Sequence, residues 1–278
     1  MKIKKANNKA SEIPLFYWSE IRFLFKNKEN YGDLLSRYLV EKISGRRVKW
    51  IHPKKQAWYK RNKTNFLAIG SILPHADKNS IVWGSGIIDR KHKIERADFR
   101  AVRGPRTRSF LLNLGYSCPE VYGDPALLLP RYFHISIKPE YKVGIIPHYN
   151  DYQEVKDLYK DDNSINVVDL MTMDVEQTTR EILKCESTIS SSLHGLIVSH
   201  AFNIPSVWVE FSNKIFGDGV KYEDYLESID MPLYHPPFIN EKKSAVELED
   251  FIKSHPNLPD PIKLKALQEE LLETWPFQ

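Results

Sequence analysis

Apolar residues follow two different periods along this chain, and the two kinds of segment alternate. In the first half, Leu34, Leu35 and Leu39 recur near the helical period and predict a helix that ends at Gly45. A second helix is predicted to begin at Pro105, because proline is favoured in a first helical turn. Short runs rich in β-branched residues predict strands at 65–73, 80–88 and 97–104. The stretch PEVYGDPALLLP predicts a further strand, followed by a turn at Gly123, Asp124 and Pro125.

The second half repeats this alternation after a linker near residues 130–140. Alternating strands and helices in both halves predict an α/β fold with two Rossmann-like, parallel-sheet domains. We place them at residues 1–135 and 136–278, with a final helix over 263–275 that can pack back on the N-terminal domain. Because parallel sheets bind ligands beyond the carboxyl ends of their strands, we expect a ligand in a cleft that the domains share. Strands are predicted at 142–149, 164–171, 187–190 and 205–210, and helices at 152–160, 174–185, 193–203 and 244–254.

Charge is divided unevenly between these halves. Residues 1–131 carry 27 Lys and Arg against 11 Asp and Glu, a net charge of +16, whereas the rest carries 13 against 25, a net charge of −12. A basic half attracts an anion, a polyanion or an anionic membrane face, although the same charges can simply keep the surface soluble and pair with the acidic half. Segment 46–63 (RRVKWIHPKKQAWYKRNK) is basic and aromatic, which suits nucleic acid, an anionic membrane or an ordinary solvated loop.

No apolar run approaches the roughly 20 residues of a membrane span, and the lysine-rich start lacks the apolar core of a signal peptide. Cys118 and Cys185 lie far apart and match no CxxC or metal-ligand spacing, so we interpret them as reduced and structural. These features predict a cytoplasmic protein without a metal or cofactor. A peripheral contact at the inner face of the cell membrane stays open.

The most informative stretch is SSSLHG, residues 190–195, where a predicted strand turns into a helix. The first N–H groups of a helix are unpaired, and its dipole favours an anion there by about 0.3–1 kcal/mol at an exposed site. Ser191 and Ser192 add hydroxyl donors, Leu193 follows them, and His194 lies in the first turn. The plain alternative is that the serines cap a buried helix and His194 is a satisfied polar group. The serine cluster and the histidine at one turn favour an anion site.

A second turn of this kind carries arginines. In AVRGPRTRS, residues 101–109, Arg103 follows a strand, and Arg106 and Arg108 lie in the first turn of the next helix. Cations there oppose the helix dipole, a cost that is tolerated at functional sites. Because a guanidinium binds phosphate or carboxylate through two parallel hydrogen bonds, Arg103 and Arg106 are candidate anion ligands. Surface arginines on a basic domain are the alternative.

Several other polar residues lie where strands end or helices begin. Asn30 and Asp33 lie at a helix entry, where Asp33 could accept a proton from a sugar hydroxyl or simply cap the helix. His148 and Asp151 follow a strand, and Glu210 ends one, so each could contact a polyol or be an ordinary loop residue. The dinucleotide fingerprint G-x-G-x-x-G and the nucleophile elbow G-x-S-x-G are both absent.

The segments NYGD, AIGSIL, VWGSG, AVRGPRT with LGY, GDPALLLP, IPHYND and SSSLHGLIVSHAFNIPSVWVE occur in this order. Together they resemble the polysaccharide pyruvyl transferase family, in its branch of bacterial exopolysaccharide ketal pyruvyltransferases, over roughly residues 28–212. The resemblance implies a two-domain fold like that of GT-B glycosyltransferases. It also implies that phosphoenolpyruvate donates a pyruvyl group, as a ketal, to two hydroxyls of a sugar in a polysaccharide or its lipid-linked precursor.

The resemblance implies that the donor binds through arginines and an S-x-R-L-H segment, which corresponds here to residues 190–194. Ser192 stands where the family frequently has arginine, so the resemblance shifts weight to Arg103, Arg106 and the helix N-terminus. On this basis His194 is the predicted acid and Asp33 the predicted base, with Asp151 and Glu210 as its substitutes.

Two other functions stay open from the sequence. One is a GT-B-type glycosyltransferase that uses a nucleotide sugar. The other is a non-catalytic protein that binds polyanions or a membrane surface.

Overall fold

The computed structural model describes residues 12–214 and 216–277, and most of its strands form two parallel sheets. Every strand pair within these two sheets is parallel, which confirms the predicted α/β class. The first sheet has the order β3 (Val48–Trp50), β1 (Ile13–Phe16), β4 (Asn65–Leu67), β5 (Ser80–Trp83), β6 (Asp98–Ala101). The second has the order β11 (Ser206–Trp208), β10 (Cys185–Ser190), β7 (Tyr141–Ile146), β8 (Ile165–Val167).

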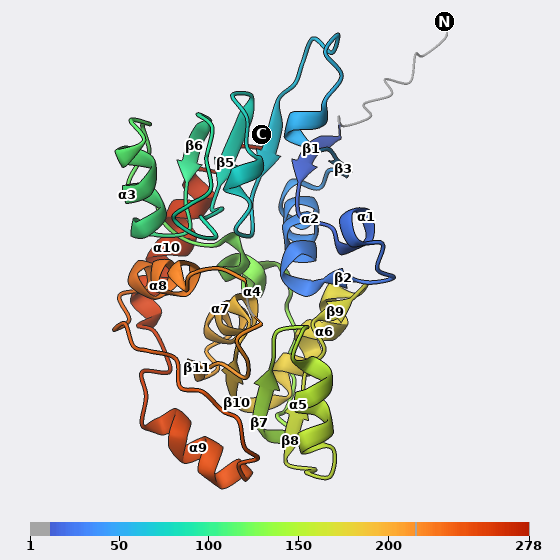
Figure 1. Cartoon of the computed structure of the whole chain (residues 1–278), viewed down its shortest axis with the longest axis vertical. Coiled ribbons are helices and arrows are strands. Elements are labelled where there is room, and N and C mark those ends of the chain that lie inside the picture. Colours follow the sequence, from blue (N-terminus) through green and yellow to red (C-terminus); the bar gives the residue numbers. More distant parts are fainter. Residues whose placement is uncertain (1–11, 215, 278) are drawn as a thin grey trace, which may run out of the picture.

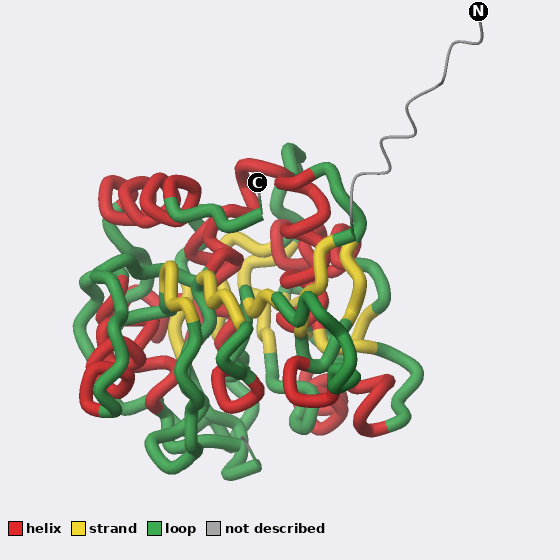
Figure 2. The backbone as a smooth tube through the Cα atoms, turned by 90° about the horizontal axis from the view of Figure 1, so that it is seen from above, coloured by secondary structure: helices red, strands yellow, loops and turns green. Residues whose placement is uncertain are grey.

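Helices flank the strands on both sides when the molecule is seen from above (Figure 2). Polar side chains begin several of them, as helix entries require: Asn30 caps α2, and Asp174 caps α6. The helices are α1 (Glu20–Leu24), α2 (Tyr31–Ser44), α3 (Pro105–Asn113), α4 (Leu129–Tyr132), α5 (Tyr152–Tyr159), α6 (Val175–Leu183), α7 (Leu193–Ala201), α8 (Val220–Ser228), α9 (Ala245–Lys253) and α10 (Pro261–Glu273). Three short 3-10 turns are η1 (Pro53–Lys55), η2 (Leu73–His75) and η3 (Pro125–Leu128).

The first sheet lies in the upper part of Figure 1 and the second in the lower part, with residues 133–140 running between them. One hydrophobic cluster nevertheless joins the two parts, because apolar residues of α2 pack with those of α7. Leu35 and Leu196 in this cluster are fully buried, and burying such a side chain contributes about 1.5–3 kcal/mol. The final helix α10 returns to the first sheet, where Trp83 Nε1 donates to the Leu271 carbonyl at 2.8 Å.

A small antiparallel ladder fixes the start of α2 against the C-terminal half. It pairs β2 (Glu29–Asn30) with β9 (Met171–Thr172). Tyr31 continues the contact, because its N–H donates to the Leu170 carbonyl at 2.8 Å and its hydroxyl lies 2.8 Å from Thr179 Oγ1. The first turn of α2 is therefore held at the boundary between the two halves.

The structure differs from the sequence prediction at several elements. The strand expected before the turn at Gly123 is reduced to an isolated bridge between Val102 and Tyr122. The chain then winds into η3, because Asp124 caps it by accepting from the Ala126 N–H at 2.9 Å. The elements that the sequence analysis did not predict include β1, α1, β3 and α8. In the described part of the chain, no helix has both the length and the apolar character that crossing a membrane requires.

Candidate functional site

A pocket of about 490 Å³ lies where strands of both sheets end. Its walls include Trp18 after β1, Ser71 after β4 and Ile88 after β5 from the first sheet. From the second sheet come segments that follow the carboxyl ends of β7 and β10. This position is where α/β sheets bind ligands. The sequence-predicted residues that line the pocket are Asn30, Asp33, His148, Ser192, Leu193 and His194.

The N-terminus of α7 forms one wall of this pocket. The Ser190 hydroxyl accepts from the Ser192 N–H at 3.0 Å, which shapes the turn, and Ser192 itself makes no side-chain cap bond. The first bond along α7 runs from Leu196 N–H to the Ser192 carbonyl at 3.1 Å. Within the described residues, the N–H groups of Leu193, His194 and the following glycine donate to no protein group. Because Leu193 and His194 line the pocket, their N–H groups are available to an anion there.

His194 faces a buried carboxylate. Its Nε2 lies 3.5 Å from Asp124 Oδ2, and the two side chains are 13% and 1% exposed. Neither of these atoms has a hydrogen-bond partner within the described residues, although both are buried. A gap of 3.5 Å needs only a small closure to reach hydrogen-bond length, and catalytic hydrogen bonds are often long before substrate binds. Asp124 is thus placed to orient the imidazole ring.

The other side of the imidazole packs against Gly32 in the first turn of α2. A Cβ at this position would collide with His194 Nδ1. The backbone of Gly32 is helical and does not itself require glycine, so the requirement comes from the close approach of the ring. His194 is held between α2 and η3.

Asp33 and Lys221 add a titratable pair. Burial, followed by the charges of Glu20 and Glu29, raises the pKa of Asp33 well above its ordinary value, while Lys221 opposes that rise. Burial and the charge of Arg103 lower the pKa of Lys221 to about 8. Lys221, in the first turn of α8, is the only lysine or arginine that lines the pocket within the described ranges. The Asp33 carboxylate therefore binds a proton more readily than an ordinary carboxylate does, and Lys221 is a cation that still carries its charge at neutral pH.

His148 and Asn30 also line the pocket, with different roles. Burial, with the charges of Lys221 and Lys26, lowers the pKa of His148 to about 4, so its ring is neutral. The His148 N–H donates to Ser191 Oγ at 2.8 Å. Ser191 therefore lies behind the pocket wall and supports His148. It was predicted to bind the donor substrate, but it does not line the pocket. Asn30 accepts from the Gly32 N–H at 2.9 Å, so its side chain is used as a helix cap.

Arg103 lies outside the pocket lining and is fully buried. Its Nε donates to Asp224 at 3.0 Å, and its two terminal nitrogens donate to Ser71 Oγ and the Ile87 carbonyl, each at 2.7 Å. The predicted anion ligand therefore has protein partners at all three nitrogens. It contacts the pocket only indirectly, because Ser71 is part of the wall.

Arg106 also lies away from the pocket. Its guanidinium binds Glu227 through two parallel hydrogen bonds of 3.0 and 2.9 Å, and it approaches Glu223 at 2.7 Å. Both carboxylates belong to α8, so this arginine joins α3 to the neighbouring helix α8. Its predicted contact with the donor has no support from this placement.

Asp151 and Glu210, the substitute bases, do not line this pocket either. Asp151 is 1% exposed and accepts from Ser212 Oγ at 2.5 Å. Glu210 lines a different hollow of about 470 Å³ together with Tyr234 and His235, and burial raises its pKa. The geometry favours Asp33 over both.

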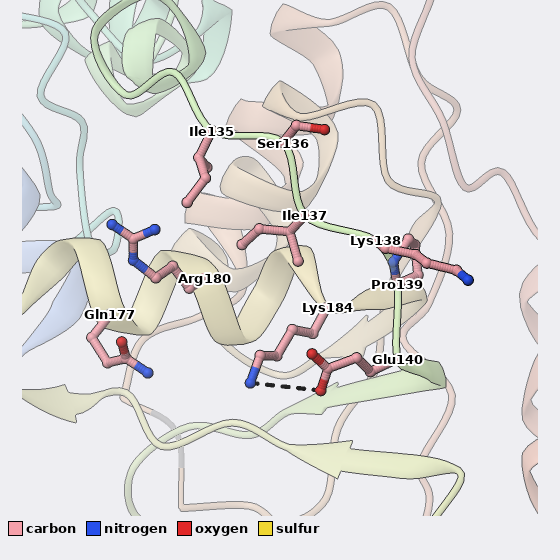
Figure 3. A pocket seen from close by; sticks show the side chains of 9 residues that line it. All are labelled: Ile135, Ser136, Ile137, Lys138, Pro139, Glu140, Gln177, Arg180 and Lys184. Carbon is pink, nitrogen blue, oxygen red and sulfur yellow. Dashed lines mark ion pairs between the residues drawn. The ribbon is translucent and has the colours of Figure 1, made fainter.

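A further hollow of about 650 Å³ lies along the linker that joins the two sheets (Figure 3). Residues 135–140 form one side and α6 the other, and the ion pair of Lys184 and Glu140 spans it at 3.7 Å. None of the sequence-predicted site residues lies there. Across residues 12–214 and 216–277, no group of three or more His, Cys, Asp or Glu is arranged to hold a metal ion.

Sequence reasoning missed Asp124 and Lys221. Asp124 stands in GDPALLLP, where the pattern indicated only a turn. Its carboxylate reaches His194 because η3 contacts α7 in the fold. Lys221 belongs to no motif, so the sequence held no signal for its place in the pocket.

Comparison with known proteins identifies the family. The family model described as polysaccharide pyruvyl transferase matches residues 15–213. An uncharacterized protein of Acanthamoeba polyphaga mimivirus is similar, with 30% identity over 209 residues that cover 73% of this chain and 71% of that protein. The matched range contains His194, Asp33 and Asp124. The chain therefore belongs to the polysaccharide pyruvyl transferase family.

Proposed function

We propose that this protein transfers the pyruvyl group of phosphoenolpyruvate to two hydroxyls of a sugar in a polysaccharide or its lipid-linked precursor, forming a pyruvate ketal. Family membership supports pyruvyl transfer and a polysaccharide acceptor. The observation that carries the finer proposal is that one pocket combines the open N-terminus of α7, His194 backed by Asp124, Asp33 and Lys221. An anion site beside an acid and a base is the arrangement that this reaction requires.

Donor binding follows from the cations and N–H groups of the pocket. Phosphoenolpyruvate carries a phosphate and a carboxylate, so it needs two anion subsites. The first N–H groups of α7 supply one, and the ammonium of Lys221 supplies the other. Lys221 thereby provides the cation that Ser192 does not, since Ser192 stands where the family frequently has arginine.

His194 acts as the acid in the first step. It delivers a proton to C3 of the enol, which becomes a methyl group and leaves C2 electron-poor. A hydroxyl of the sugar adds to C2, and the bond from C2 to the phosphate oxygen breaks. Asp124 keeps the imidazolium in place, as a buried carboxylate does in other acid–base pairs.

Asp33 acts as the base. It takes the proton of an attacking hydroxyl, and its raised pKa makes it a stronger base than an ordinary carboxylate. After phosphate leaves, the second hydroxyl adds to C2 and closes the ketal. Of the two hydroxyl protons, one replaces the proton that His194 gave to C3 and the other leaves with phosphate. His148 and the cap residue Asn30 line the acceptor side.

Purified protein incubated with phosphoenolpyruvate and a panel of sugars or lipid-linked oligosaccharides tests the proposal. We expect phosphate release that depends on the acceptor, together with a product whose proton NMR spectrum shows a new methyl singlet. A vinyl signal would instead indicate an enolpyruvyl ether, which has the same added mass and contains only one new C–O bond. That result, or consumption of a nucleotide sugar without phosphoenolpyruvate, would reject ketal formation.

A further inference from the structure

The loop between β3 and β4 is built differently from the pocket and is not used by the proposed reaction. It extends away from the first sheet at the top of Figure 1. Two large aromatic residues are presented to solvent there, Trp58 with 87% and Tyr59 with 74% of the residue's surface exposed. Such exposure costs free energy unless something covers the rings, because burying aromatic surface is strongly favourable.

Hydrogen bonds within the loop hold these rings outward. Gln56 Nε2 donates to the Lys63 carbonyl at 2.7 Å, and Lys60 Nζ donates to Gln56 Oε1 at 2.6 Å. The Lys60 N–H also closes a turn on the Ala57 carbonyl at 3.1 Å. The aromatic pair therefore stands at the tip of an ordered loop.

Cations of the same loop line a hollow of the surface, together with one lysine from the following segment. Two carboxylates, Asp77 and Glu95, line this hollow with five cations: Lys54, Lys60, Arg61, Lys63 and Lys78. Asp77 is used within its own turn, where it accepts from the Asn79 N–H at 2.9 Å, and Glu95 pairs with Lys54 at 2.9 Å. The remaining positive charges face solvent without acidic partners in this hollow.

We propose that this loop docks the protein on an anionic membrane surface, with Trp58 and Tyr59 in the headgroup region and the cations of the loop on acidic lipids. Trp and Tyr prefer the membrane–water interface, and each Lys or Arg near an anionic leaflet adds roughly a fivefold gain in binding. Nucleic acid fits the loop less well. Single strands stack on ring faces along a groove, whereas here the rings meet edge to face at 84° on a protruding loop.

The docked loop also places the pocket near the bilayer. Lys54, at the base of the loop, donates to the Pro74 carbonyl at 3.0 Å, and Pro74 lines the pocket. Lys55 lies 5.9 Å from the ring of Phe23, which belongs to α1. The end of α1 exposes Leu24, which also lines the pocket. If the proposed function holds, a lipid-linked acceptor would meet the pocket at this edge, but membrane docking does not depend on that reaction.

Co-sedimentation of the full chain with vesicles tests the docking, without donor or acceptor present. We expect binding to vesicles of phosphatidylcholine with phosphatidylserine, weakening with salt, and none to phosphatidylcholine alone. Trp58→Ala/Tyr59→Ala and Lys55→Glu/Arg61→Glu should each lower the affinity about tenfold or more. Val246→Ala/Ile262→Ala and Lys160→Glu/Lys253→Glu change exposed residues elsewhere on the protein and should leave the affinity unchanged.

The docking proposal is overturned if the wild-type chain does not bind the acidic vesicles, or if the two loop variants bind them like the two controls. It is also overturned if the loop variants lose binding to an RNA oligonucleotide and keep binding to the vesicles. If the wild-type chain does not turn over phosphoenolpyruvate with a sugar acceptor in the absence of lipid, that result counts against the proposed reaction and not against the docking.

Discussion

Two turns of this protein each connect a parallel strand to the N-terminus of a helix. One of them opens into the pocket, whereas the other is paired with protein carboxylates. The N-terminus of α7 carries Ser192 and His194 and opens into the pocket. The N-terminus of α3 carries Arg106, follows Arg103, and is closed by carboxylates of α8. The open turn offers unpaired N–H groups and a histidine, whereas the arginines of the closed turn are already neutralised. Groups that could bind an anion are therefore available to a ligand only where the fold gives them no protein partner.

Replacing His194 should have the largest effect on the open turn. In His194→Ala the proposed acid is lost, and we expect pyruvyl transfer to fall by about 10²–10⁴ with an unchanged melting temperature. The measurement is the initial rate of phosphate release at saturating phosphoenolpyruvate. His134→Ala is the matched control, because His134 is exposed and lies outside the pocket. Near-normal transfer by folded His194→Ala would remove the acid from this turn.

Replacing Arg103 should act on folding. Arg103→Met leaves Asp224 buried without its cation, since both side chains are 0% exposed, and we expect a loss of about 3–5 kcal/mol in the free energy of unfolding. Urea denaturation measures this. The double variant Arg103→Met/Asp224→Leu should recover part of the loss, because no unpaired charge remains. An unchanged stability with a raised KM for phosphoenolpyruvate would instead make Arg103 a donor ligand and erase the difference between the two turns.

Gly32 tests how closely the open turn is packed. In Gly32→Ala the new methyl collides with the His194 ring, which must move away from its present place. Because a displacement of about 1 Å can cost roughly 10²-fold in rate, we expect kcat to fall by that order. Gly45→Ala is a useful contrast, since open space surrounds Gly45 and a positive φ there predicts a loss of stability instead. A Gly32→Ala enzyme with normal kcat would contradict the placement of His194.

Lys221 should affect donor binding and its pH dependence. Because the pKa of Lys221 is lowered to about 8, its ammonium is charged below that pH and neutral above it. The KM for phosphoenolpyruvate should therefore rise as pH increases through 8. Lys221→Met should raise KM about tenfold or more at neutral pH, as expected for one charged hydrogen bond. Lys221→Arg should keep its charge and remove the rise above pH 8. A rise that persists in Lys221→Arg would assign it to another group.

Much of the fold could be predicted from local pattern, and less of the site. Parallel strands and the SSSLHG turn follow from residues that are neighbours in the sequence. The pairing of the arginines before and in α3 could not be predicted in this way, because Arg103 and Arg106 each bind a carboxylate that is 121 residues away in the sequence. Asp124 is likewise read locally as a turn residue, and only the contact of η3 with α7 brings it to His194. Pairing over such distances is decided by packing, which no spacing rule encodes.

Arg106 should show the smallest effect and is the finest test of the comparison. Its guanidinium pairs with Glu227 and Glu223 at a partly exposed site, so Arg106→Gln should cost about 0–1 kcal/mol in the free energy of unfolding. Arg106 lies outside the pocket, and surface ion pairs contribute little. We therefore expect kcat and the KM for phosphoenolpyruvate to stay within about twofold of the wild-type values. Arg37→Gln, which also breaks a surface pair, is the control. A KM that rises only in Arg106→Gln would mean that the α3 turn opens when substrate binds, and the two turns would then share the donor.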